Sequence, residues 1–227
     1  GMMHLPPLVT KRGIIHLYKI GILFENREFE HDVYELIKAF YPEAEIHTLY
    51  ENAEAEYDLR FSVERDNDSY IIKYERTENL SKQETEQKGV ISADILSKEN
   101  AGCGIQDAHA LRKENKDNIK YALYQKLVKL TGRTLPWGNL TGIRPAKLAM
   151  GMIESGMKNT EAAREMRERY LVSPQKTALA ITIANREREI LKDIDYENGY
   201  SLYIGIPFCP SICLYCSFSS YPLKLWA

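Results

Sequence analysis

The sequence has few cysteines, no long apolar run and no excess of charge of either sign. Four of its 227 residues are cysteine, which excludes the small secreted folds that a dense disulfide framework holds together. No segment reaches the about 18 to 20 consecutive apolar residues of a membrane-spanning helix, and the N-terminus lacks the apolar stretch of a signal peptide. These absences predict a reduced, cytoplasmic protein without a membrane span.

Charge is balanced, since 30 basic and 32 acidic side chains give a formal net charge of −2. Such a surface offers no large positive field for a phosphate backbone, so we expect no nucleic-acid partner. The acidic run at 51–58 predicts a solvated loop. The histidines lack the spacing of metal ligands and are expected to have no special role. They are His4, His16, His31, His47 and His109.

The first part of the chain, 1–112, predicts a small α+β domain. β-branched and aromatic residues at 14–24 favour a strand, and apolar residues at helical spacing between 29 and 41 favour a helix. Alternating apolar residues at 59–63 and 70–74, with a polar turn between them, predict a β-hairpin.

The end of this part predicts a partly mobile linker or loop. It is polar from 75 to 89, and Gly102 and Gly104 interrupt any regular pattern. Between these glycines, Cys103 is expected to be a small buried residue rather than a ligand.

Residues 113–199 predict a helical domain. Ile119, Leu123, Leu127 and Leu130 lie on one helical stripe, and Gly132 is placed to end that helix. The prolines and glycines of 135–145 predict a structured loop. Two further helices are predicted, one from Lys147 to Glu154 and one from a cap at Thr160 to Tyr170. A third begins at Ser173-Pro174 and continues towards Asp193. Its predicted apolar stripe consists of Leu179, Ile183 and Ile190.

Three cysteines in the last part, 200–227, form a C-x3-C-x2-C run at Cys209, Cys213 and Cys216. Three thiolates this close favour a metal. A [4Fe–4S] cluster normally has four cysteine ligands, so three would leave one iron without a protein ligand. A zinc site, which would need a distant fourth ligand, and buried or disulfide-bonded cysteines are the alternatives.

This region resembles the radical S-adenosylmethionine (SAM) superfamily. An apolar stretch, Leu202 to Ile206, is expected to be the strand that precedes the cluster loop, and Tyr215 directly precedes the third cysteine. Within the superfamily, Tyr203-Ile-Gly-Ile-Pro-Phe-Cys209 is similar to the oxygen-independent coproporphyrinogen III oxidase family. With the run Leu135 to Leu148, it looks closer still to the coproporphyrinogen dehydrogenase branch of Gram-positive bacteria. The resemblance covers the second half of the chain firmly and the first half weakly.

The resemblance implies a [4Fe–4S] cluster on the three cysteines and SAM beside Tyr203 and Tyr215. A core position in a strand is the alternative for Tyr203. Phe208 and Phe218 would shield the cluster from water. The best known oxidases have a further cysteine at the position of Phe218, whereas the related radical SAM heme chaperones do not. Residues 200–227 would form only the first strand and cluster loop of a truncated β/α barrel.

The implied reaction is oxidative decarboxylation of coproporphyrinogen III to protoporphyrinogen IX in heme biosynthesis, which requires a reducing electron donor. The isolated chain is expected to be inactive, because most of the barrel is missing. Alternatives are another radical SAM enzyme, a heme chaperone, or a non-catalytic docking module. An exposed strand edge at 202–206 could also support a homodimer.

Arg144, in the loop 135–145, has two possible roles. Its guanidinium could recognise a propionate of the substrate, since arginine binds carboxylates through two hydrogen bonds. It could also stabilise the loop by stacking near Trp137 or by binding backbone carbonyls, and this structural role is the one we expect.

Overall fold

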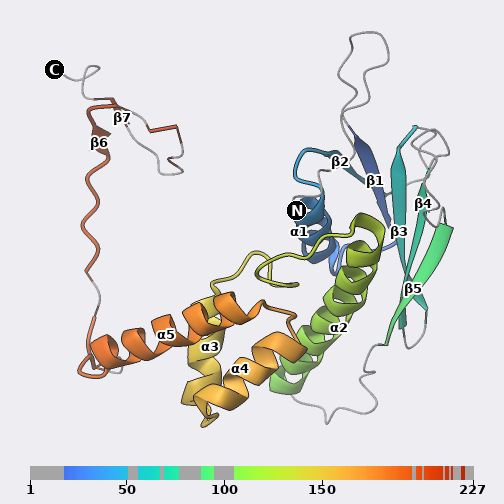
Figure 1. Ribbon diagram of the computed structural model, residues 1–227. Coiled ribbons are helices and arrows are strands. Elements are labelled where there is room, and N and C mark those ends of the chain that lie inside the picture. Colours follow the sequence, from blue (N-terminus) through green and yellow to red (C-terminus); the bar gives the residue numbers. More distant parts are fainter. Residues whose placement is uncertain are drawn as a thin grey trace. The chain divides into compact units, whose positions relative to one another are not determined.

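The computed structural model describes residues 18–50, 56–66, 69–76, 88–94, 105–195, 198–200, 202–211, 213–214, 216 and 221–222. The chain divides into two compact units, 1–188 and 189–227, and each is described by itself. The described residues of the first unit form a β-sheet and five helices, the last of which continues to Leu191 (Figure 1). The α+β class predicted from the sequence is confirmed.

The sheet has five strands in the order β2-β1-β3-β4-β5. They are β1 (Lys19–Phe24), β2 (Glu45–Leu49), β3 (Leu59–Asp66), β4 (Ser69–Arg76) and β5 (Lys88–Asp94). β1 pairs in parallel with β2 and β3, and the other pairs are antiparallel. The predicted first strand and hairpin are therefore confirmed over their described residues; the turn residues 67–68 and positions 14–17 lie outside them.

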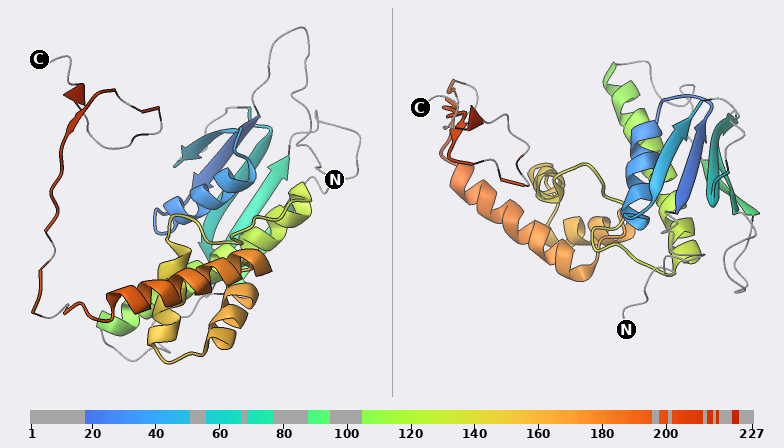
Figure 2. Two further views of the ribbon diagram at one scale, coloured as in Figure 1. Left: turned by 60° about the vertical axis from the view of Figure 1, so that its left-hand side comes forward. Right: turned by 90° about the horizontal axis from the view of Figure 1, so that it is seen from above.

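Helices α1 (Glu30–Phe40) and α2 (Ile105–Thr131) cover one face of the sheet (Figure 2). Alternate residues of β1, β3 and β4 are buried, and they share one hydrophobic core with α1 and α2. The predicted stripe of α2 is buried in this core and consists of Ile119, Leu123, Leu127 and Leu130. Each such side chain contributes about 1.5 to 3 kcal/mol through removal from water, so burial positions α2 firmly on the sheet.

The prediction of a linker from 75 to 112 is wrong where the structure describes this range. β5 pairs with β4 along its length, and α2 already begins at Ile105; Cys103 lies outside the described residues. β2 was also not predicted. Both strands carry few apolar residues, so their pairing depends on neighbours elsewhere in the chain rather than on their own propensity. The predicted boundary between the first two domains, after residue 112, falls within α2. The division of the chain into three domains stays a prediction.

A second hydrophobic core lies among α3 (Pro145–Glu154), α4 (Asn159–Glu168) and α5 (Pro174–Leu191). These helices confirm the predicted ones, with small shifts at their ends. α4 begins two residues early, where the backbone N–H of Lys158 donates to Glu161 Oε2 at 2.8 Å. No helix in the described ranges is both long and apolar enough to cross a membrane.

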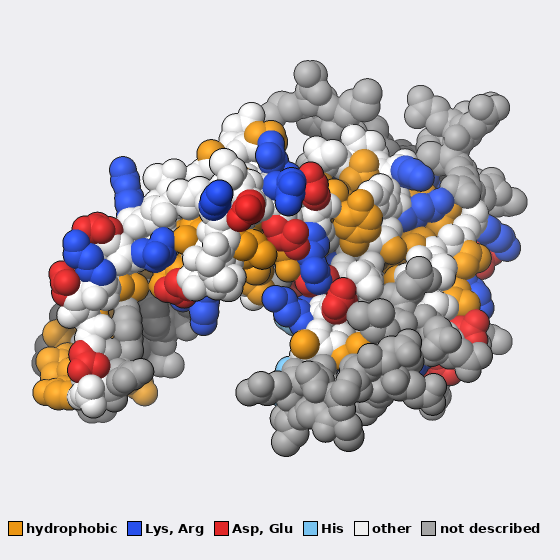
Figure 3. Space-filling view, turned by 90° about the horizontal axis from the view of Figure 1, so that it is seen from below, with side chains coloured by type: hydrophobic (Ala, Val, Ile, Leu, Met, Phe, Trp, Pro, Cys, Tyr) orange, Lys and Arg blue, Asp and Glu red, His pale blue; other side chains and the backbone are white. Residues whose placement is uncertain are grey.

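The predicted apolar stripe of α5 is wrong. Leu179 and Ile190 are 43% and 73% exposed. The buried side consists instead of small residues, Thr177, Ala180 and Ala184, which let neighbouring helices approach closely. On the face of the molecule in Figure 3, basic and acidic side chains are intermingled.

Two glycines with left-handed backbones shape the chain after α2. Gly132 has φ +66° and its N–H donates to Val128 O at 2.8 Å, which ends the helix as predicted. Gly138, in the predicted loop, has φ +59°, and a Cβ there would overlap the carbonyl oxygen of Tyr170. Only glycine allows the loop to approach Tyr170 this closely.

Gly138→Ala should therefore lower the free energy of unfolding by about 3 kcal/mol, because it adds backbone overlap to left-handed strain. Gly132→Ala is the matched control. It has similar strain, but nothing lies within 4 Å of its added Cβ, so it should cost only about 1 kcal/mol. Urea unfolding followed by circular dichroism measures both; equal losses would contradict the close approach at Gly138.

Candidate functional site

The second unit contains the cysteine loop. Its two short strands, β6 (Phe208–Cys209) and β7 (Tyr221–Pro222), pair in parallel. The N–H of Tyr221 donates to Pro207 O at 2.7 Å, and the rings of Phe208 and Tyr221 lie 6.3 Å apart. This pairing fixes Cys209 at the start of the loop.

The other two cysteines lie in a turn that follows. The N–H of Cys216 donates to Cys213 O at 3.0 Å, which closes the two-residue spacing between them. Cys213 is exposed, Cys209 and Cys216 are half-buried, and none of the three forms a disulfide. Three sulfurs on one accessible loop match the donor set of an iron–sulfur cluster.

The thiols are not assembled into a metal site in the structure. Within the described ranges, no three side chains of His, Cys, Asp or Glu are close enough together to hold a metal ion. A ligand set commonly assembles only when the metal binds, and the cluster on the three cysteines stays a prediction.

The predicted strand from Leu202 to Ile206 is not found. These residues have no regular secondary structure, and Tyr203 is 84% exposed. A strand requires a neighbour to accept and donate its backbone hydrogen bonds, and the described part of this unit provides none before Phe208. The core position considered for Tyr203 is likewise absent. Tyr215 and Phe218 lie outside the described residues.

The loop 135–145 in the first unit is held in place by buried polar groups. The N–H of Asn139, a buried residue, donates to Tyr170 O at 3.0 Å. Lys120 Nζ donates to the hydroxyl of Thr141 at 2.9 Å. Burial lowers the pKa of Lys120, while the nearby negative charge of Asp32 opposes this shift.

Asp117 of α2 connects this loop region to α4. The hydroxyl of Tyr170 donates to Asp117 Oδ2 at 3.0 Å, and Arg169 Nη2 lies 3.2 Å from the same oxygen. Burial, followed by the charge of Asp117, raises the pKa of Tyr170, so this hydroxyl remains a proton donor. The sequence did not predict this cluster, because its members lie more than 50 residues apart and carry no shared motif.

Arg144 does not have the structural role expected of it. It is an exposed residue at the N-terminal boundary of α3, and its side chain makes no hydrogen bond or ion pair with the described residues. The ring of Trp137 instead lies 5.1 Å from Lys176 Nζ. The loop therefore keeps its shape through Gly138, Asn139 and Thr141.

Comparison with known proteins shows that this chain is similar to a bacterial protein. The chain is 32% identical, over 158 residues, to the oxygen-independent coproporphyrinogen-III oxidase-like protein HemZ of Bacillus subtilis. The match covers 64% of this chain and 30% of the relative, so the chain spans about a third of the relative's length. No protein-family profile and no solved structure matches the chain.

Asp117→Ala should lower the free energy of unfolding by about 2 to 3 kcal/mol, because it leaves the buried Tyr170 hydroxyl without its acceptor. Glu75→Ala is the control. Its partner, Lys88, lies 2.5 Å away and both side chains are more than half exposed, so the loss should stay below about 1 kcal/mol. Thermal and urea unfolding compare the two variants; an Asp117→Ala protein as stable as Glu75→Ala would show that the cluster contributes little.

Proposed function

We propose that the chain is part of a radical SAM enzyme of heme biosynthesis, and its similarity to an oxygen-independent coproporphyrinogen-III oxidase-like protein supports this proposal. The observation that carries the proposal is the C-x3-C-x2-C run on an accessible loop, in a chain similar to HemZ. Three cysteine ligands leave one iron of a [4Fe–4S] cluster open, which is the arrangement that SAM needs in order to bind.

In this proposal the thiolates of Cys209, Cys213 and Cys216 hold the cluster. A bound cluster with SAM supplies one-electron cleavage of the sulfonium and a carbon radical that abstracts hydrogen. Tyr203 begins the run Tyr-Ile-Gly-Ile-Pro-Phe-Cys, which ends at Cys209, the first of the three cysteines. Its side chain would turn towards SAM when residues 202–207 gain a neighbouring strand. Phe208, which already packs on Tyr221, would exclude water from one side of the cluster.

The proposed reaction converts two propionate side chains of coproporphyrinogen III into the vinyl groups of protoporphyrinogen IX. Each propionate loses a hydrogen atom from its β-carbon, then CO2 and one electron, so an electron acceptor is needed for each vinyl group and a reducing donor for each SAM cleaved. The cytoplasm is the compartment that suits an oxygen-sensitive cluster.

A heme chaperone is the second candidate, because Phe218 stands where the best known oxidases have a cysteine. The two functions differ in what happens to the tetrapyrrole. The full-length enzyme would convert coproporphyrinogen in a SAM-dependent reaction, whereas a chaperone would bind heme tightly and release it unchanged.

Reconstitution of the purified chain with iron and sulfide under anaerobic conditions tests the cluster. We expect about four irons and four sulfides per chain and, after reduction, the EPR signal of a [4Fe–4S]⁺ cluster. Cys213→Ala should abolish the signal, and Cys103→Ala, the matched control outside the run, should retain it. One zinc per chain in place of iron, or a signal that survives Cys213→Ala, would overturn the assignment.

The 227 residues alone should form no protoporphyrinogen from coproporphyrinogen, SAM and a reductant, because they span only 30% of the relative's length. A full-length homologue, assayed in parallel by high-performance liquid chromatography with fluorescence detection, is the positive control. Product formation by the 227-residue chain, absent from its Cys213→Ala variant, would contradict this expectation.

A further inference from the structure

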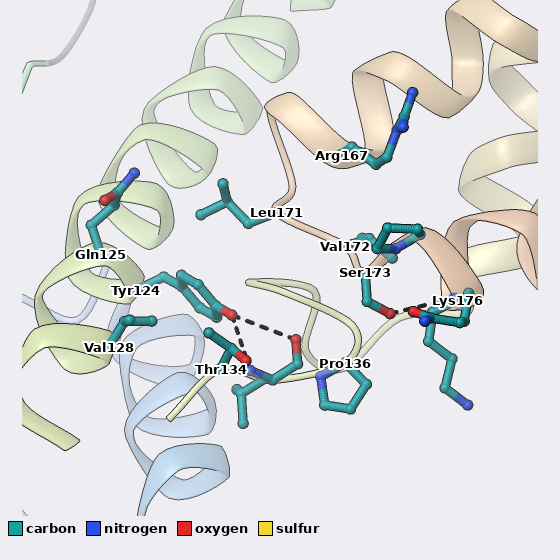
Figure 4. A pocket seen from close by; sticks show the side chains of 13 residues that line it. Tyr124, Gln125, Val128, Thr134, Pro136, Arg167, Leu171, Val172, Ser173 and Lys176 are labelled. Carbon is teal, nitrogen blue, oxygen red and sulfur yellow. Dashed lines mark hydrogen bonds between the residues drawn. The ribbon is translucent and has the colours of Figure 1, made fainter. Parts of the chain in front are cut away.

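A groove with an apolar lining lies beside Leu171 in the first unit (Figure 4). Polar groups in its wall bond to each other, since the N–H of Leu135 donates to the hydroxyl of Tyr124 at 3.0 Å. The charged ends of Arg167 and Lys176 point away from it. The groove therefore presents apolar surface rather than charge, and a pair of mutually reactive groups lies instead in the second unit.

This pair is Asn198-Gly199, the single Asn-Gly sequence of the chain. The side-chain amide carbon of asparagine is an electrophile, and the backbone nitrogen of the next residue is a nucleophile towards it. Attack forms a bond between this nitrogen and Cγ, closes a succinimide ring and expels the amide nitrogen as ammonia, which takes the proton of the attacking N–H. Water then opens the ring to aspartate or isoaspartate. Glycine favours the attack, because it has no Cβ to shield the nitrogen or to restrict the backbone.

The surroundings of the pair leave the reaction open. Both residues are exposed and belong to no helix or strand, so water reaches the amide of Asn198 and no ladder of backbone hydrogen bonds keeps Gly199 in place. Asn159, in α4, is also exposed, but it precedes Thr160, whose stiff, branched side chain hinders the same attack. Position 198 therefore combines a reactive sequence with exposure.

Asp195 binds both nitrogens that take part in the reaction. Its backbone oxygen accepts a hydrogen bond from the N–H of Gly199 at 3.0 Å. Its Oδ2 accepts from the Nδ2 of Asn198 at 3.0 Å, and its Oδ1 accepts from the N–H of Asn198 at 3.0 Å. One residue thus holds the nucleophile and the leaving group.

These hydrogen bonds slow the attack. The nitrogen of Gly199 must lose its proton and turn towards Cγ, which breaks its bond to the backbone of Asp195. The nearby carboxylate also disfavours the negative charge that forms on this nitrogen, because like charges repel. The turn at Asp195 therefore protects the amide of Asn198 as long as the turn is closed.

The same turn requires the glycine that makes Asn198 reactive. A Cβ at position 199 would lie 2.3 Å from the backbone oxygen of Asp195, which is an overlap with the backbone rather than a contact. A larger residue would therefore displace the turn. Protection by Asp195 and susceptibility to attack are properties of one short segment.

We propose that Asn198 is a site of spontaneous deamidation and that Asp195 controls its rate. The reaction replaces an amide that donates to Asp195 by a carboxylate that repels it, so the product opens the turn. Isoaspartate also places an additional carbon in the backbone between α5 and the cysteine loop. The modification needs only water and neither cluster nor SAM, so it does not rest on the proposed function.

The full 227-residue chain is incubated without iron at mildly alkaline pH and physiological temperature, and samples are digested and analysed by liquid chromatography and mass spectrometry. The peptide that contains Asn198 should gain the mass difference between an amide and a carboxyl group and separate into aspartate and isoaspartate forms. It should react faster than the peptide that contains Asn159 in the same sample. A rate at Asn198 no higher than that at Asn159 would overturn the site.

Asp195→Ala should deamidate about fivefold faster than the parent chain, the factor expected for the loss of one net hydrogen bond. Asp193→Ala, the matched control, removes an exposed carboxylate close by in the sequence and should react like the parent. Gly199→Ala should react more slowly than the parent although it displaces the turn, because its methyl group shields the attacking nitrogen.

Equal rates in Asp195→Ala and Asp193→Ala would overturn the control by Asp195. An unchanged rate in Gly199→Ala would show that the nitrogen of residue 199 is not the nucleophile and would overturn the proposed reaction. Circular dichroism verifies that each variant is folded. Failure of the chain to assemble a cluster would refute the proposed function and leave the deamidation site intact.

Discussion

The carboxylate of Asp117 links the two cores of the first unit, and the loop 135–145 is attached to that link through Tyr170. Asp117 lies on α2, whose apolar side belongs to the core of the sheet, while its partner Tyr170 belongs to the core of α3, α4 and α5. A buried carboxylate is stable only when its oxygens accept hydrogen bonds. Tyr170 and Arg169 satisfy it, so α2 and the end of α4 are held at one separation. The loop 135–145 is held against this point, because the N–H of Asn139 donates to Tyr170 O.

The sequence was informative where a single segment carries its own pattern. The stripe from Ile119 to Leu130 predicted the buried side of α2, and Gly132 predicted its end, because helical spacing and a left-handed cap are local properties. Local patterns did not predict β2 and β5, whose pairing partners lie elsewhere in the chain. They also gave the wrong side of α5, where close packing by Ala180 and Ala184 outweighed the larger side chains of Leu179 and Ile190.

The cysteine loop differs from the first unit in how much of its geometry the chain itself determines. The spacing of Cys209, Cys213 and Cys216 specifies a set of donors, and the turn between the last two is already formed. Under the proposal, a bound metal would bring the three sulfurs together and compensate for the entropy of closing the loop. Likewise, the apolar run 202–206 would become a strand only with a neighbour. The sequence thus names candidate site residues, but it does not determine their mutual arrangement.

We propose that three cysteines hold a cluster whose fourth iron is left for SAM. Mössbauer spectroscopy of the chain reconstituted with ⁵⁷Fe, recorded with and without SAM, tests this proposal most directly. We expect the spectrum of a [4Fe–4S] cluster in which SAM changes the signal of one iron site and leaves the others unaltered. A cluster that does not respond to SAM, or iron that forms no [4Fe–4S] cluster, would contradict it.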